Sequence, residues 1–450
     1  MTMIRAVRAQ SGMTGRVDWT FIAAISGLIV TGSLAMLSAA STTLFYDAIL
    51  SKHFIALTVG VTLFAMTLAF NYQVFQDQSK FVYVLAIVIV AATLLLGKIS
   101  RGQRSWVHVL GFSFQPAEMA RTLVILALAD FLDRRSRRIG DLATVLGTLG
   151  LAVPVMLLIL KQPDFSTALT FVPAIFGMLF CAGANLFQLL VIFGYGGVAI
   201  IIPLVYTFCQ VRYPYAPESS LPGIVLATAQ MGWVTLATIL VFCAIGFISW
   251  RMATWMRVQV KPAAFVAIPV LLSAALLSGI IVQRGLKGHQ RNRLVAWISP
   301  KSDVQGAAYN VIQSQIAIGS GGMWGKGLFS GTQSKLGFLP ERHTDFVFAN
   351  VGEEMGFLGS SLILGLYMLV LWRIVTAARL ARDRYGYLVC AGLVSTLAFQ
   401  LILNVGMCVG LMPVAGVPLP LVSYGGSSLL VTLWTLGIVA NIYARRYALL

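Results

Sequence analysis

Long apolar runs alternate with short polar connectors along this chain, and the length of the runs predicts membrane-spanning helices. The runs are continuous and about twenty residues long, as an α-helix needs to cross a bilayer. A transmembrane barrel would instead show alternating segments of about ten residues. We therefore expect an all-α polytopic membrane protein with about 12 transmembrane helices. The predicted spans are residues 19–39, 54–71, 81–98, 116–132, 142–160, 166–183, 187–208, 223–250, 263–283, 345–371, 387–408 and 425–443.

Composition agrees with this pattern, since 58% of the residues are hydrophobic and only 10% are charged. The net charge of +17 does not indicate a nucleic-acid surface, because most Lys and Arg residues lie at predicted helix ends or in one loop. The five cysteines form no CxxC pair, and we interpret them as packing residues. The first apolar run lacks a convincing small-residue cleavage site, so we interpret it as a first span rather than a removed signal.

The distribution of cations predicts the orientation. Seventeen Lys and Arg residues lie on one side of the predicted spans, against six in the short loops of the other side. The positive-inside rule makes the first side cytoplasmic, and an even number of spans then leaves both termini there.

The segment 284–344 is the one long outer connector, and it is rich in cations. Long loops within a compact membrane domain are usually functional. Its cations either contact lipid headgroups or form an electropositive surface that binds an anionic group such as a pyrophosphate. The candidates for the second role are Arg284, Lys287, Arg291, Arg293, Lys326, Lys335 and Arg342.

Other outer segments carry polar groups beside the membrane. Arg101, Arg104 and Trp106 suggest a segment that lies in the interface before the next helix starts at Pro116. Glu118 and Arg121 would share a helix face, either as a structural ion pair or as groups that position a catalytic loop.

Two further outer features leave alternatives open. Asp164 follows a proline and is explained either by a turn or by a functional role. The run LMPVAGVPLPLVSYGGSS (residues 411–428) predicts a re-entrant element, with a tight outer turn as the alternative, because irregular backbone at membrane depth requires burial in protein or a cavity.

Several kinds of chemistry are excluded. GSGGMWGKG fails the GxxxxGK[ST] spacing of a phosphate loop, the four histidines are too scattered for a zinc motif, and GxSxG is absent.

Asp345 remains, an acid at the start of apolar sequence with cations around it. Spacing alone cannot separate a helix cap from a carboxylate that accepts the proton of an acceptor hydroxyl. A proton-accepting carboxylate suits transfer from a lipid pyrophosphate to a hydroxyl. The leaving pyrophosphate needs cations or a divalent ion such as Mg²⁺ or Mn²⁺ to stabilise its charge. Asp345 is the candidate ligand of such an ion.

The motifs themselves resemble those of a known family. FSFQPAEMAR, LKQPDFSTAL, AAYNVIQSQIAIGSGGMWGKGLFSGTQSKL, GFLPERHTDFVFANVGEEMGFLG and PLPLVSYGGSS resemble, in order, the SEDS family of bacterial cell-wall proteins, and the similarity extends from about residue 20 to the C-terminus. GLFSGTQSKLGFLPERHTDF is more similar to the elongation-type members than to the division-type ones.

The resemblance implies a peptidoglycan glycosyltransferase of the bacterial inner membrane that polymerises lipid II, with Asp345 as the catalytic carboxylate and a class B penicillin-binding protein as partner. Arg104, Trp106, Glu118 and the SYGG element (Ser423–Gly426) match further motif positions. Together with the loop cations, the predicted substrate-binding residues are Arg101, Arg104, Trp106, Glu118, Arg121, Arg291, Arg293, Lys326, Lys335, Arg342, His343, Ser423 and Tyr424.

The chain departs from the family in two places. Arg121 stands where the family commonly has lysine, which keeps the charge and alters the donor geometry. The family typically has ten spans, so we interpret residues 1–450 as one SEDS-type domain in which 208–262 is an inserted loop with part of an additional helix pair. A lipid II flippase and a scaffold for the transpeptidase are the alternative functions.

Overall fold

A computed structural model describes residues 17–41, 46–100, 103–109, 112–217, 219–257, 262–286, 288–300, 308–339 and 341–447. The chain divides into two compact units. Unit 1 comprises residues 1–185 and 313–450, and unit 2 comprises residues 186–312.

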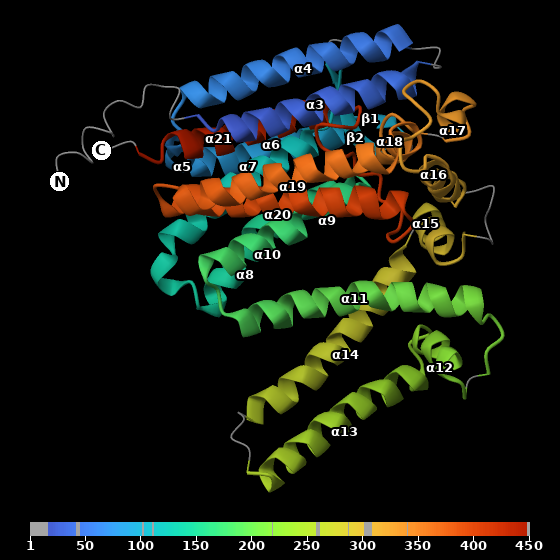
Figure 1. Cartoon of the computed structure of the whole chain (residues 1–450). Coiled ribbons are helices and arrows are strands. Elements are labelled where there is room, and N and C mark those ends of the chain that lie inside the picture. Colours follow the sequence, from blue (N-terminus) through green and yellow to red (C-terminus); the bar gives the residue numbers. More distant parts are fainter. Residues whose placement is uncertain are drawn as a thin grey trace. The chain divides into compact units, whose positions relative to one another are not determined.

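Unit 1 is a helical bundle with one small sheet (Figure 1). Its first half contains α3 (Trp19–Ala40), α4 (Tyr46–Ala69), α5 (Gln73–Asp77), α6 (Ser79–Leu96), β1 (Lys98–Ser100), β2 (Gln103–Val109), β3 (Phe112–Phe114), α7 (Pro116–Arg134), the 3₁₀ turn η1 (Ser136–Arg138), α8 (Leu142–Lys161), α9 (Phe165–Leu169) and α10 (Phe171–Ala182). Its second half contains most of α16 (Tyr309–Ser320), then α17 (Thr332–Lys335), α18 (Val347–Glu354), α19 (Gly356–Leu380), α20 (Arg384–Cys408) and α21 (Gly426–Ala444).

Unit 2 contains α11 (Leu186–Arg212), α12 (Leu221–Thr228), α13 (Trp233–Trp255), α14 (Pro262–Gly285) and α15 (Gly288–Ile298). Within it α14 packs against both α11 and α13. The side chains of α13 are mostly exposed and apolar, including Trp233, Leu240 and Phe247, as expected of a helix that faces lipid.

The prediction of a polytopic helical protein is confirmed. Among the described residues, 11 helices are long and apolar enough to cross a membrane. Each of the predicted spans overlaps a helix of the structure. The predicted span 116–132 corresponds to α7, which is not among the 11 because it carries several charged residues, including Glu118, Arg121 and Asp130. The chain is therefore a multi-pass membrane protein.

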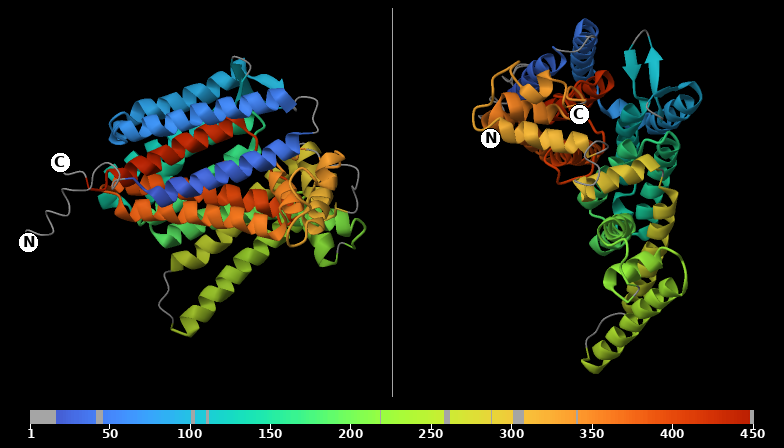
Figure 2. Two further views of the ribbon diagram at one scale, coloured as in Figure 1. Left: turned by 45° about the horizontal axis from the view of Figure 1, so that its top comes forward. Right: turned by 90° about the vertical axis from the view of Figure 1, so that its right-hand side faces the viewer.

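The bundle of unit 1 is held by close helix packing. α21 lies along α4, where Gly60 approaches Leu433 and Gly437 approaches the backbone of Phe64. The side-chain amide of Asn441 donates to the carbonyls of Thr67, Leu68 and Phe70, which lack partners within α4 because that helix ends there. α19 and α20 run side by side in Figures 1 and 2, and α20 is buried along most of its length.

Ion pairs and hydrogen bonds join the helices at the end of α19 that lies away from Asp345. Arg373 pairs with Asp18, the N-cap of α3, at 2.6 Å. Asp383, the N-cap of α20, accepts from the hydroxyl of Tyr72 at 2.8 Å and from the amide of Gln73 at 3.0 Å. These contacts join α19 to the start of α3, and the start of α20 to the start of α5.

The structure corrects three details of the sequence interpretation. The interfacial segment after α6 forms strands, with β2 between β1 and β3 in an antiparallel sheet, visible as a small projection in Figure 2 (right). The predicted span 223–250 divides into α12 and α13. The predicted span 345–371 is also divided, because the chain turns at Gly356 (φ +64°), so α18 precedes α19 as a separate short helix.

Candidate active site

Asp345 lies in a turn at the start of α18, and its backbone is fixed by α20. The amide of Asn404 donates to the carbonyl oxygen of Asp345 at 3.0 Å and to that of Val417 at 2.8 Å. The N-cap of α18 is Phe346, not Asp345, so the capping alternative for Asp345 is wrong.

The segment 409–425 forms the other side of this turn. It has no regular secondary structure, yet Val417, Leu419, Leu421 and Val422 are buried. The hydroxyl of Tyr367 donates to the carbonyl of Pro420, and that of Ser166 donates to the carbonyl of Ala415. Irregular backbone is thus buried within protein here, as the sequence led us to expect of a re-entrant element.

Gly416 brings this segment up to the carboxylate of Asp345. Its φ is +67°, a conformation that favours glycine, and a Cβ at this position would lie 3.5 Å from Oδ2 of Asp345. The Sγ of Cys408 lies 4.0 Å from the carbonyl oxygen of Asp345. Asp345 therefore occupies a niche between the C-terminal end of α20 and segment 409–425, and its side chain is half-buried.

His343, Ser423 and Tyr424 belong to the same niche. The backbone N–H of Tyr424 donates to the carbonyl of His343 at 2.8 Å, and the two rings lie 5.8 Å apart. The hydroxyl of Ser423 accepts from the N–H of Leu419 at 2.8 Å and so stabilises the local turn. Burial raises the pKa of the Tyr424 phenol.

Arg342 lies beside this turn and is buried. Its Nε donates to the carbonyl of Ala39 at the C-terminal end of α3, at 2.7 Å. Burial lowers the pKa of its guanidinium, while the charge of Glu354 opposes that shift. A cation at a helix C-terminus also interacts favourably with the helix dipole, so Arg342 has a structural contact whether or not it binds an anion.

The remaining loop cations have different surroundings. Lys326 pairs with Glu353 at 2.9 Å, whereas the side chain of Lys335 is exposed. Arg291 and Arg293 lie on α15 in unit 2, where Arg291 donates to the amide oxygen of Gln210 at 2.5 Å. The described parts of segment 284–344 thus include the short helices α15, α16 and α17, and their cations belong to two units.

Arg104 and Trp106 lie on β2, where Arg104 is exposed and Trp106 is half-buried. Arg101, the third predicted member of this group, lies outside the described residues.

Glu118 and Arg121 are buried in the first turns of α7. No ion pair within 4.0 Å joins these two described residues. The carboxylate of Glu118 instead contacts the hydroxyls of Ser427 and Ser428. The guanidinium of Arg121 donates to the hydroxyl of Thr170 at 3.1 Å. The simple ion pair predicted from their spacing is thus replaced by contacts to α21 and α10. Asp164 caps α9 and accepts from the amide of Gln115 at 2.5 Å, which explains it as a structural residue.

The described residues contain no group of three or more His, Cys, Asp and Glu side chains that could hold a metal ion. Asp345 would be the protein carboxylate of a site completed by substrate oxygens, and Mg²⁺ commonly binds through one or two carboxylates plus phosphates.

Comparisons with known proteins decide the family. A family model described as "Cell cycle protein", of the FtsW, RodA and SpoVE group, matches residues 16–216 and 219–448. This chain belongs to the SEDS family. The chain is 32% identical to the peptidoglycan glycosyltransferase RodA of Treponema pallidum, over 88% of this chain and 89% of that protein.

Other members are almost as similar. A probable peptidoglycan glycosyltransferase FtsW of Trichlorobacter lovleyi is 29% identical over 93% of this chain and 89% of its own length. A solved structure titled "Structural coordination of polymerization and crosslinking by a peptidoglycan synthase complex" aligns with a TM-score of 0.67 and 28% identity, over 96% of this chain and 99% of that chain. The similarity thus extends over almost the whole chain, including both units.

Sequence reasoning missed the residues that hold the niche together. Asn404 and Gly416 lie 59 and 71 residues after Asp345, and no spacing rule relates such distant positions. Glu353 and Glu354 stand in the motif GFLPERHTDFVFANVGEEMGFLG, where a pair of acids in apolar sequence indicates that they have buried partners.

Proposed function

We propose that this chain is a peptidoglycan glycosyltransferase that polymerises lipid II into glycan strands. Its family membership supports the reaction class, and the niche of Asp345 supports the site. The observation that carries the proposal is a half-buried carboxylate whose backbone is held by Asn404 and whose side chain faces the glycine backbone of segment 409–425. A carboxylate in such a setting can accept a proton from a bound hydroxyl.

In the proposed reaction, Asp345 accepts the proton of the acceptor sugar hydroxyl as that oxygen attacks the anomeric carbon of the donor. The new C–O bond forms as the bond to undecaprenyl pyrophosphate breaks, with inversion at that carbon. The pyrophosphate leaves with the electron pair, so a single carboxylate suffices, unlike in a glycosidase that must protonate a poor leaving group.

Charge on the leaving pyrophosphate requires cations close to the niche. Lys335 is exposed in the segment before Asp345, and Arg342 and His343 lie in the same turn. A divalent ion held by Asp345 and by pyrophosphate oxygens would supply further positive charge there.

We further propose an elongation role, based on the similarity to RodA, with a division role as in FtsW as the alternative. The distribution of cations supports cytoplasmic termini and a niche on the outer face of the bacterial inner membrane. A class B penicillin-binding protein is the proposed partner, because the aligned solved structure is titled as a complex for polymerisation and crosslinking.

The test uses the purified full chain, lipid II in detergent or nanodiscs, and gel analysis of the glycan product, with and without Mg²⁺ or Mn²⁺ and partner. The proposal predicts glycan strands. Movement of lipid II across liposomes without any polymer would favour the flippase, and neither activity, together with recruitment of the transpeptidase, would favour the scaffold.

A further inference from the structure

We infer that Glu353 and Lys326 are positioning residues for Asp345: they form an ion-paired clamp that fastens segment 321–335 to the far end of α18. This inference rests on the proposed function, because it concerns how the same site is held. It also assigns Lys326 a role different from binding pyrophosphate.

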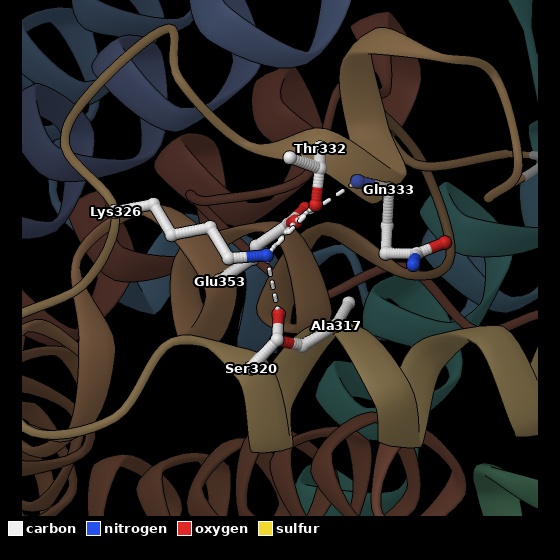
Figure 3. A network of polar contacts seen from close by, with 6 residues as sticks. All are labelled: Ala317, Ser320, Lys326, Thr332, Gln333 and Glu353. Carbon is white, nitrogen blue, oxygen red and sulfur yellow. Dashed lines mark hydrogen bonds and ion pairs between the residues drawn. The ribbon is translucent and has the colours of Figure 1, made fainter.

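The carboxylate of Glu353 lies at the centre of the clamp (Figure 3), and its side chain is fully buried. Its Oε1 accepts from Nζ of Lys326 at 2.9 Å, from the hydroxyl of Thr332 at 3.0 Å and from the N–H of Gln333 at 2.9 Å. One oxygen atom thus contacts a cation, a hydroxyl and a backbone donor from a single segment.

Nζ of Lys326 makes three hydrogen bonds to protein oxygens, and its side chain is 26% exposed. Besides Glu353, its Nζ donates to the hydroxyl of Ser320 at 2.7 Å and to that of Thr332 at 2.8 Å. An ammonium group has three N–H donors, so no donor remains for a phosphate oxygen while this network is intact. Its charge is neutralised by Glu353, which also weakens its attraction for an anionic substrate.

The neighbouring acid, Glu354, holds the same segment from the other side. Its Oε1 accepts from the hydroxyl of Ser38 on α3 at 2.6 Å, and the Ser38 oxygen accepts from the N–H of Phe329 at 3.1 Å. Burial raises the pKa of the Glu354 carboxyl, and the hydrogen bonds from Ser38, Phe329 and Gly331 oppose this. Two consecutive acids therefore join α18 to the segment and to α3.

Backbone contacts make this attachment close. The N–H groups of Lys326 and Gly327 donate to the carbonyls of Glu353 and Glu354, both at 3.0 Å. A Cβ at Gly325 would lie 2.1 Å from the carbonyl oxygen of Glu354, and one at Gly321 would lie 1.9 Å from that of Gly352. The segment lies directly on the C-terminal end of α18, which leaves no room for a side chain at either glycine.

The clamp reaches Asp345 through α18. This helix has 8 residues and begins two residues after Asp345, so its other end is held by the clamp. A helix of this length is not stable by itself, so its position depends on contacts at both ends. Release of the clamped end would let α18 and the turn before it shift, and a displacement of about 1 Å at a catalytic group can cost about 100-fold in rate.

The experiment compares Glu353→Gln, Lys326→Met and the double variant in lipid II polymerisation, with kcat and KM measured on monodisperse protein. Both single variants are expected to lower kcat by about 100-fold with little change in KM. The double variant is expected to be no worse than the poorer single one, because the fully buried Glu353 without its cationic partner is the costly state. Lys52→Met, an exposed lysine on α4, is the matched control and should match wild type.

A different set of results would overturn the inference. If Lys326→Met raises KM, Glu353→Gln has wild-type kinetics and the double variant shows the sum of the two single effects, then Lys326 is a substrate ligand. If the charge variants do not fold, Thr332→Val decides, since it removes one hydroxyl and leaves the ion pair intact. It should lower kcat by about tenfold relative to Ser330→Ala, and equal kcat values would overturn the clamp. An inactive wild type would instead refute the proposed function itself.

Discussion

Asp345 and Glu353 lie near the two ends of one short helix, yet their carboxylates have opposite surroundings. Glu353 is fully buried, and one of its oxygens accepts three hydrogen bonds. Asp345 is half-buried, and its main-chain carbonyl receives the strong contact from Asn404 while its carboxylate faces Gly416. The clamp thus fixes one end of the helix through a side chain, whereas the contact from Asn404 fixes the backbone just before its other end.

Among the residues that surround Asp345 in the niche, the largest effect is expected at Asn404, which joins the niche to α20. Asn404→Ala removes the donor to Asp345 and to Val417 at once, and we expect kcat to fall by about 100-fold through misplacement of the carboxylate. Polymerisation kinetics provide the measurement. Gln400→Ala, an amide one helical turn earlier, is the control, and equal kcat values for the two variants would mean that the niche does not position Asp345 through its backbone.

A smaller effect is expected at Gly416. Gly416→Ala introduces a Cβ 3.5 Å from Oδ2 of Asp345 and forces a left-handed residue, which costs about 1–2 kcal/mol. We expect kcat to fall by about tenfold, since the new methyl group comes into van der Waals contact with the carboxylate and restricts its position. Gly183→Ala has a similar φ of +88° with open space around the Cβ, so it reports backbone strain alone. A loss of activity that is the same in both variants would assign the effect to strain.

Arg342 lies beside the niche and is expected to contribute to the stability of the folded protein. Arg342→Ala leaves the carbonyl of Ala39 without this donor, and an unsatisfied buried polar group costs about 1–3 kcal/mol. We expect a lower melting temperature in detergent, with partial recovery in Arg342→Lys. An unchanged melting temperature in Arg342→Ala, together with a raised KM, would make this residue a substrate ligand rather than a structural one.

The smallest effect is expected at Lys335, whose side chain is exposed. An exposed charge contributes at most about 1 kcal/mol, so Lys335→Ala should raise the KM for lipid II by no more than about fivefold. The increase should shrink at high salt, because surface electrostatics are screened. A kcat effect that does not respond to salt would instead place Lys335 at the reacting groups.

The sequence predicted the spans well because twenty-residue apolar runs have few alternatives in a bilayer. It placed Asp345 at the membrane boundary, but spacing could not show that Phe346, rather than Asp345, is the N-cap of α18. It also grouped the loop cations as one surface. Their partners depend on distant contacts such as Arg342 with Ala39 and Lys326 with Glu353, which no local pattern specifies.

The strands after α6 and the break at Gly356 were missed for a similar reason. The run from Lys98 to Phe114 mixes charged and aromatic residues, and its pairing into a sheet depends on a register that composition does not give. The turn at Gly356 places its backbone against Gly325, a residue 31 positions earlier, so the interruption of the helix is a tertiary effect.

The most direct test of the account is the activity of Asp345→Asn, which keeps the size of the side chain and removes its ability to accept a proton. The purified variant should be monodisperse, melt at the temperature of wild type and lose at least about 100-fold in the rate of lipid II polymerisation. Glu341→Gln, an acid of the same turn, is the control and should retain activity within about twofold. Glycan strands made by Asp345→Asn at the wild-type rate would contradict the assignment of Asp345 as the catalytic carboxylate.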